Sequence, residues 1–108
     1  TITYNVTPVV SNGVVSSEVP SSFGLSQNYP NPFNPTTQIK YDIAKASFVT
    51  LKVFDVLGNE VSTIINGNMN AGRYSAEFNA SSLSTGIYFY SLSVDGIKVD
   101  TKKMILVK

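Results

Sequence analysis

The stretch from Leu83 to Val94 constrains the fold of this chain more than any other part of the sequence. From Ile87 onward nearly every residue is β-branched, aromatic or a small hydroxyl residue, a composition that favours a β-strand. Successive side chains of a strand point to opposite faces, so we expect one face to enter a core and both faces to be covered near Ile87. The residues expected to point inward are Tyr88, Tyr90, Leu92 and Val94.

Short motifs on either side predict how this strand begins and ends. Leu83-x-x-Gly86-x-Tyr88 has the layout of a tyrosine corner, in which the hydroxyl bonds to upstream backbone, so we expect Tyr88 to be structural. Asp95-Gly96 suits a type I′ turn, because both central residues need positive φ. The apolar residues of 97–107 change parity, which predicts a bulge near residues 101–103 or burial of both faces at the end of that strand.

Four further segments are expected to be strands, and three of them alternate apolar and polar residues. They span residues 38–43, 48–55, 60–65 and 73–79. A flexible loop is expected at 66–72, and a corner or one helical turn at 79–83. Together the segments predict an all-β protein, an immunoglobulin-like antiparallel β-sandwich of about six to seven strands. Phe54 falls on the outer face and would need cover. The residues expected inside are Ile39, Tyr41, Ile43, Val49, Leu51, Val53, Tyr74, Ala76 and Phe78.

The chain divides into three parts. Residues 1–22 form a strand-like tail that is a linker, the end of a preceding domain, or a strand donated to a neighbour. Residues 23–37 form an extended, polyproline-like lead-in, and residues 38–108 form the sandwich. Leu25, Tyr29 and Phe33 are spaced to attach the lead-in to an apolar surface. Because the chain begins with Thr1, we expect it to be a piece of something longer.

Composition narrows the range of functions. The 108 residues carry a net charge of +1 with no basic patch, so nucleic-acid binding has no electrostatic basis. They contain no histidine and no cysteine, which removes a Ser–His nucleophile, thiolate metal sites and disulfides. No apolar run is long enough to span a membrane. We therefore expect no enzyme activity, no cofactor and no metal.

Several separated motifs, in a fixed order, resemble the type A C-terminal sorting domain of the type IX secretion system. The opening motif is residues 25–37, with Tyr29-Pro30-Asn31-Pro32-Phe33-Asn34-Pro35 at its centre. The resemblance continues through residues 49–58, 60–61, 71–72 and 84–90, and it ends with residues 101–108. Six motifs in order are far more specific than any one of them, and they cover the chain from Leu25 to Lys108.

The resemblance implies a bacterial cargo protein that crosses the periplasm and is carried through the outer membrane to the cell surface or the medium. It implies outer-membrane and sortase components of the secretion system as partners. A last strand with a free edge would suit recognition by strand addition. The residues implied in recognition are Gly86, Ile87, Tyr88, Lys102, Lys103 and Lys108, and those of the lead-in are Tyr29, Pro30, Pro32, Phe33 and Pro35.

Two alternatives to an export signal remain at this point. One is a subunit of an extracellular filament or surface layer, a homo-oligomer in which the N-terminal tail adds a strand to a neighbouring copy. The other is a carbohydrate-binding module that uses the outward aromatic residues Phe54 and Phe89.

Overall fold

The computed structural model describes residues 13–16 and 19–108, and in this part of the chain it contains eight strands and no helix. Six strands have eight residues or more: β3 (Thr36–Ile43), β4 (Ser47–Phe54), β5 (Glu60–Met69), β6 (Gly72–Asn79), β7 (Gly86–Val94) and β8 (Ile97–Leu106). Two are short: β1 (Gly13–Ser16) and β2 (Gly24–Leu25). The prediction of an all-β sandwich is confirmed.

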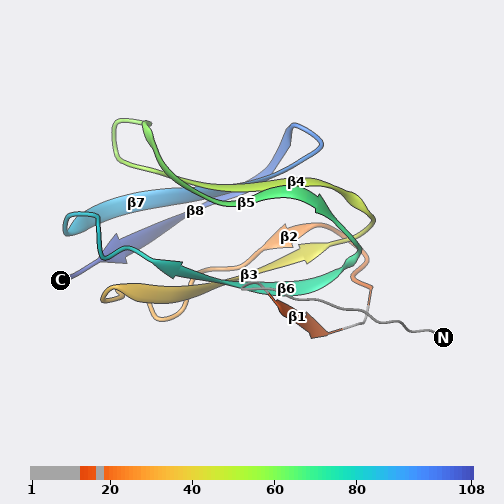
Figure 1. The fold of residues 1–108 in the computed structure, drawn as a ribbon, viewed down its shortest axis with the longest axis horizontal. Coiled ribbons are helices and arrows are strands. Elements are labelled where there is room, and N and C mark those ends of the chain that lie inside the picture. Colours follow the sequence, from red (N-terminus) through yellow and green to blue (C-terminus); the bar gives the residue numbers. More distant parts are fainter. Residues whose placement is uncertain (1–12, 17–18) are drawn as a thin grey trace.

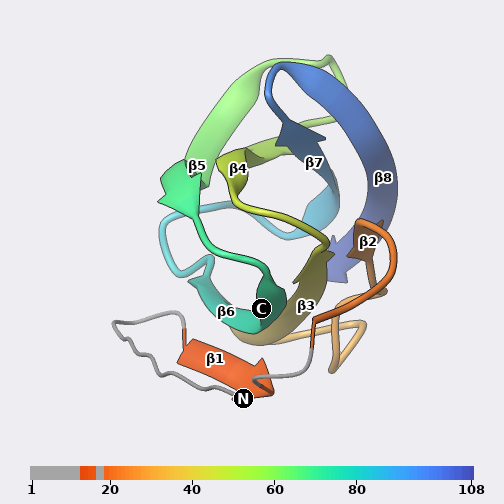
Figure 2. The same ribbon diagram turned by 90° about the vertical axis from the view of Figure 1, so that its right-hand side faces the viewer.

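The strands form two four-stranded sheets, in which every pair of neighbouring strands is antiparallel. One sheet has the order β1-β6-β3-β2 and the other β5-β4-β7-β8. The sheets lie face to face as two layers (Figure 1), and the end-on view in Figure 2 places β2 beside β8 on one side of the sandwich. In the second sheet, β7 is an inner strand between β4 and β8.

The core lies between the layers and follows the alternation of the strands. Tyr88, Tyr90, Leu92 and Val94 of β7 are all buried, as the sequence predicts. The nine residues expected inside from β3, β4 and β6 are buried as well. Tyr41 and Tyr74, on neighbouring strands, stack with ring centroids 5.4 Å apart. Alternation therefore predicted the facing of these strands correctly, because burying one face is what fixes the register of a sheet.

The β7–β8 hairpin turns as expected but has its bulge elsewhere. Asp95 and Gly96 have φ of 51° and 83°, as a type I′ turn requires. The ladder pairs Leu92 with Asp100 and Ser93 with Lys98, so the residue between them, Val99, is the extra one. The bulge precedes the predicted site near residues 101–103, because the inward and outward faces of β8 exchange just after the turn.

Three local expectations are wrong. Ile87 is 41% exposed, so β7 is not covered on both faces at its start. β5 continues to Met69, which leaves only residues 70–71 as the loop before β6, because β4 supplies a partner along that whole length. The corner after β6 contains turns and no helix, with Leu83 partly buried against the core.

The described part of the tail pairs within its own chain. β1 runs antiparallel to β6, with Gly13 opposite Ser75 and Val14 opposite Tyr74. The expected alternation over residues 1–6 lies outside the described residues. This pairing gives no support to the exchange of tail strands between copies.

Candidate functional site

The corner that starts β7 also holds the last residue of the sequence. The Tyr88 hydroxyl donates a hydrogen bond to the carbonyl oxygen of Ser84 at 2.7 Å, which confirms the predicted tyrosine corner. The Lys108 ammonium donates to the carbonyl oxygens of Ser81 at 2.6 Å and Leu83 at 2.8 Å. Lys108 follows β8, so these two hydrogen bonds tie the chain after β8 to the corner before β7.

The residues implied in recognition do not share one face. On the β7–β8 pair, Ile87 and Lys103 lie on the outer face, where both are exposed. Tyr88 is buried in the core, and Lys102 lies opposite the buried Tyr90 on the inner face. Only Ile87, Lys103 and the exposed part of Lys108 are therefore open to a partner that approaches the outside of the sheet.

Lys102 has a plain structural explanation, whereas Gly86 has no steric one. Lys102 is half-buried and pairs with Asp100, with 3.5 Å between Nζ and Oδ2. Inward-pointing charges of this kind on an outermost strand of a sheet discourage pairing with other chains. A Cβ added at Gly86 would meet no atom closer than 4.0 Å, so the local space does not require glycine there.

The lead-in covers the outer edge of β8. The Phe33 N–H donates to the carbonyl oxygen of Ile105, and the Val107 N–H donates to the carbonyl oxygen of Phe33, both at 2.9 Å. The Ile105 N–H donates to the Asn31 side-chain oxygen at 2.9 Å. The expectation that this edge is free is wrong between residues 105 and 107, because the lead-in folds back along it. A further side-chain contact extends this cover, from Gln27 Nε2 to the carbonyl oxygen at position 103, at 2.6 Å.

A buried polar network holds the other end of the lead-in. Asn28 is 2% exposed, and its N–H donates to the Tyr90 hydroxyl at 2.7 Å. That hydroxyl donates in turn to the carbonyl oxygen of Ser26 at 2.7 Å. The Asn28 amide nitrogen donates to Thr37 Oγ1 at 3.0 Å and to the carbonyl oxygen of Pro30 at 3.1 Å. Every buried side-chain polar atom in the described residues has a partner, so this network is complete.

The apolar residues of the lead-in contribute unequally. Phe33 is 2% exposed, and its ring centroid lies 6.4 Å from that of Phe78. Leu25 is buried as expected, but Tyr29 is 80% exposed, so its expected packing against an apolar surface is wrong. The backbone of Tyr29 instead pairs with Gln38 on β3 at 3.0 Å. The lead-in therefore differs from a free polyproline helix, whose backbone is fully solvated.

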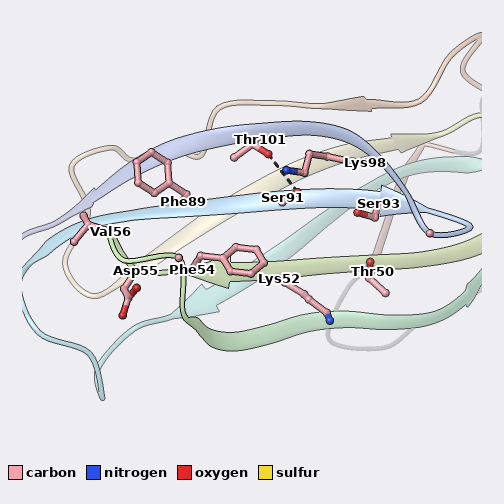
Figure 3. A pocket seen from close by; sticks show the side chains of 12 residues that line it. Thr50, Lys52, Phe54, Asp55, Val56, Phe89, Ser91, Ser93, Lys98 and Thr101 are labelled. Carbon is pink, nitrogen blue, oxygen red and sulfur yellow. Dashed lines mark hydrogen bonds between the residues drawn. The ribbon is translucent and has the colours of Figure 1, made fainter.

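A shallow groove crosses the outer face of the second sheet, with a volume of about 680 Å³. Figure 3 shows the Phe54 and Phe89 side chains on neighbouring strands at one end, where the ladder pairs them directly. Phe54 is half-buried and lines this groove, so the cover expected for it is not present in the described residues. The groove is lined by Thr50, Lys52, Phe54, Asp55, Val56, Gly58, Phe89, Ser91, Ser93, Gly96, Lys98 and Thr101.

Most charged groups around this groove are held in local contacts. The Asp55 carboxylate accepts hydrogen bonds from the N–H groups of Leu57 and Asn59 at 2.9 Å. Lys52 pairs with Glu60 at 3.4 Å. No group of three or more potential metal ligands occurs in the part of the chain that the structure describes. The groove thus presents aromatic rings, hydroxyls and ammonium groups.

Burial explains the raised pKa values of two core tyrosines. Desolvation raises the pKa of Tyr90 to about 12. Desolvation and the neighbouring Tyr74 also raise the pKa of Tyr41. Both groups lie in the core, where the neutral hydroxyl is the favoured form.

Sequence reasoning missed the polar residues that fasten the lead-in, Asn28 and Asn31. Both stand among other polar and proline residues without periodicity, so no local pattern marks one as buried and the other as an edge acceptor. The only signal in the sequence for these two residues was the family resemblance of the motif that contains them. That motif groups both with Phe33 but does not say what either residue contacts.

No helix among the residues described is long and apolar enough to cross a membrane. The family model described as "Secretion system C-terminal sorting domain" matches residues 27–108. No curated protein matches the chain. The matched range begins in the lead-in and includes β3 to β8, so it takes in both the corner and the covered edge.

Proposed function

This chain belongs to the secretion system C-terminal sorting domain family, and we propose that it is the non-catalytic part of a secreted protein, read by the export machinery through its surface. As a type IX sorting signal, it marks its protein for secretion across the outer membrane to the cell surface or the medium. The family match over residues 27–108 is the observation that carries this proposal.

We place recognition on the outer face of β7 and β8 and the corner beside it. Ile87 and Lys103 are the two residues implied in recognition whose side chains are exposed there. Tyr88 and Lys102 support the same strands from the inner face, and Lys108 holds the corner in place. Partners of this surface are outer-membrane components of the secretion system, and a sortase acts later on the sequence that precedes the domain.

The proposed organisation has residues 1–22 as a connection to the cargo, residues 23–37 as the lead-in and residues 38–108 as the sandwich. The hydrogen bonds of Asn28 and Phe33 support treating the lead-in and the sandwich as one working unit. A cut that removes this unit from its cargo would then fall before the lead-in.

The test uses a reporter protein fused to this chain in a bacterium with the secretion system. Deletion of residues 104–108 would also remove the core residues Met104 and Leu106, so surface substitutions are the sharper test. Ile87→Ser and Lys103→Glu should each lower the amount of reporter in the medium at least fivefold. Lys45→Glu, at an exposed turn residue between β3 and β4, is the matched control.

Thermal melts of the purified variants establish that all of them fold. Secretion at the level of the unchanged chain by folded Ile87→Ser and Lys103→Glu would contradict the proposed surface. Full secretion of a reporter that lacks the whole of residues 27–108 would contradict the sorting function itself.

A further inference from the structure

We propose that the β8 edge from Lys103 to Val107 is a strand-docking site, that the lead-in occupies it in the isolated domain, and that an extended strand of the export machinery replaces the lead-in there. The inference rests on the proposed function, since that function supplies the partner. The docking edge is distinct from the outer face of the sheet, and the lead-in acts as its removable cover.

The contacts on this edge are those of strand addition. Phe33 pairs with Leu106 in parallel, and its N–H and carbonyl bond to Ile105 and Val107. In strand addition, main-chain bonds of this kind supply affinity, while pockets for alternate side chains supply specificity. The pocket here holds the Phe33 ring, which packs near Phe78. The edge therefore fits an extended segment with an aromatic side chain at the Phe33 position.

The lead-in fills this edge incompletely. The Ile105 N–H is bonded by the side chain of Asn31 and the Lys103 carbonyl by the side chain of Gln27, where a regular strand would offer main-chain groups. Every second residue of a strand bonds to the same neighbour, and Phe33 uses both of its main-chain groups on β8. The ladder positions on either side of it are Asn31, which uses its side chain, and Pro35, which has no N–H to donate. A regular incoming strand can thus form main-chain bonds that the lead-in cannot, which favours replacement.

The lead-in can leave this edge without detaching from the domain. Asn28 is fastened separately, through Tyr90 and Thr37, on the inner side of the sandwich. The residues between this anchor and Phe33 are all exposed. Opening the edge requires Phe33 to leave its pocket, Asn31 to release the Ile105 N–H and Gln27 to release the Lys103 carbonyl. The bonds of Asn28 to Tyr90 and Thr37 remain.

The direct test measures binding of a fluorescent ten-residue peptide to the 108-residue chain. The peptide has the sequence of residues 27–36 with Pro30→Thr, Pro32→Thr and Pro35→Thr, so that every position can donate an N–H. The chain is studied unchanged, with Asn31→Ala and Phe33→Leu together, and with Asn34→Ala as the matched control. Asn34 is exposed and has no hydrogen bond among the described contacts.

We expect the double variant to bind the peptide at least tenfold more tightly than the unchanged chain or the Asn34→Ala control. A peptide that also carries Phe33→Ala should lose this binding. Equal affinity for all three chains, or no binding to a folded double variant, would overturn the inference. If the double variant unfolds, Asn31→Ala alone is used, with hydrogen exchange of the Ile105 amide as the readout. Its exchange should be at least tenfold faster than in the unchanged chain and should slow again when peptide is added, and an unchanged rate counts against a docking edge.

The two proposals fail separately. Peptide binding is measured on purified protein, so it does not depend on export. If the reporter fused to the unchanged chain is not secreted, the sorting function fails whatever the peptide does. If that reporter is secreted and the peptide does not bind, only the docking edge fails.

Discussion

The backbone N–H of Asn28 donates a hydrogen bond of 2.7 Å to the hydroxyl of Tyr90, 62 residues later in the chain. Asn28 belongs to the lead-in and Tyr90 to the middle of β7, so one contact joins the first matched motif to the central strand. The hydroxyl also donates to the carbonyl oxygen of Ser26. Tyr90 is therefore both a core side chain and the polar partner that positions the lead-in.

Tyr90→Phe should lower the free energy of unfolding by about 1–3 kcal/mol, because it leaves the buried Asn28 N–H without an acceptor. Urea unfolding measures the change. Tyr29→Phe is the matched control, since the Tyr29 side chain is exposed, and it should leave the unfolding midpoint unchanged. Equal midpoints for both variants would mean that the Asn28–Tyr90 bond contributes nothing to stability.

Tyr88→Phe should lower the free energy of unfolding by about 1 kcal/mol, because it removes only the corner hydrogen bond to Ser84. Tyr90→Ala truncates a side chain that is 0% exposed and should lower it by about 3–5 kcal/mol. Denaturant melts compare the two values directly. Similar losses for the two variants would be inconsistent with the way these side chains are placed on β7.

Gly96→Ala should lower the free energy of unfolding by about 1–2 kcal/mol, because its φ of 83° is unfavourable for a residue with a Cβ. No atom lies within 4 Å of the added Cβ, so backbone conformation is the only cost. Gly67→Ala is the control: its Cβ also meets nothing within 4 Å, and its φ is not positive. Gly67→Ala should be neutral or slightly stabilising, and a loss as large as that of Gly96→Ala would refute the explanation by φ.

Stability should fall as the pH rises above about 10, where tyrosines of the unfolded chain lose their protons. Burial raises the pKa of Tyr90 to about 12 and raises the pKa of Tyr41 and Tyr74 as well. A raised folded pKa means that the folded state binds more protons than the unfolded state in this range. The contribution of these groups is thus complete below pH 10 and is lost as the pH rises through the folded values.

Urea unfolding from pH 8 to pH 12, with tyrosinate absorbance followed in parallel, tests this dependence. Tyr41→Phe removes one of the retained protons and should make the decline between pH 10 and pH 12 shallower. Tyr29→Phe should not change it. A stability that stays constant through this range would contradict the raised pKa values.

The sequence alone determined the existence of the six long strands, the inward faces of β3, β4, β6 and β7, the tyrosine corner and the Asp95-Gly96 turn. These features depend on the spacing of residues close together in the chain: alternation marks the buried face, and a two-residue turn needs residues that tolerate positive φ. The ordered motifs also identified the family before any contact was known. The bulge was expected too late, because a parity change shows that an extra residue exists but does not fix which one it is.

Only the tertiary structure decided what covers β8 and which recognition residues face solvent. The cover depends on Asn31 and Phe33 meeting Ile105 and Val107, more than 70 positions later, and no periodicity reports a contact between segments so distant. Lys102 and Lys103 are neighbours in sequence, yet pairing with β7 places them on opposite faces. The physical reason is that an edge is free or covered according to where another segment lies, a property of the assembled layers and not of the strand itself.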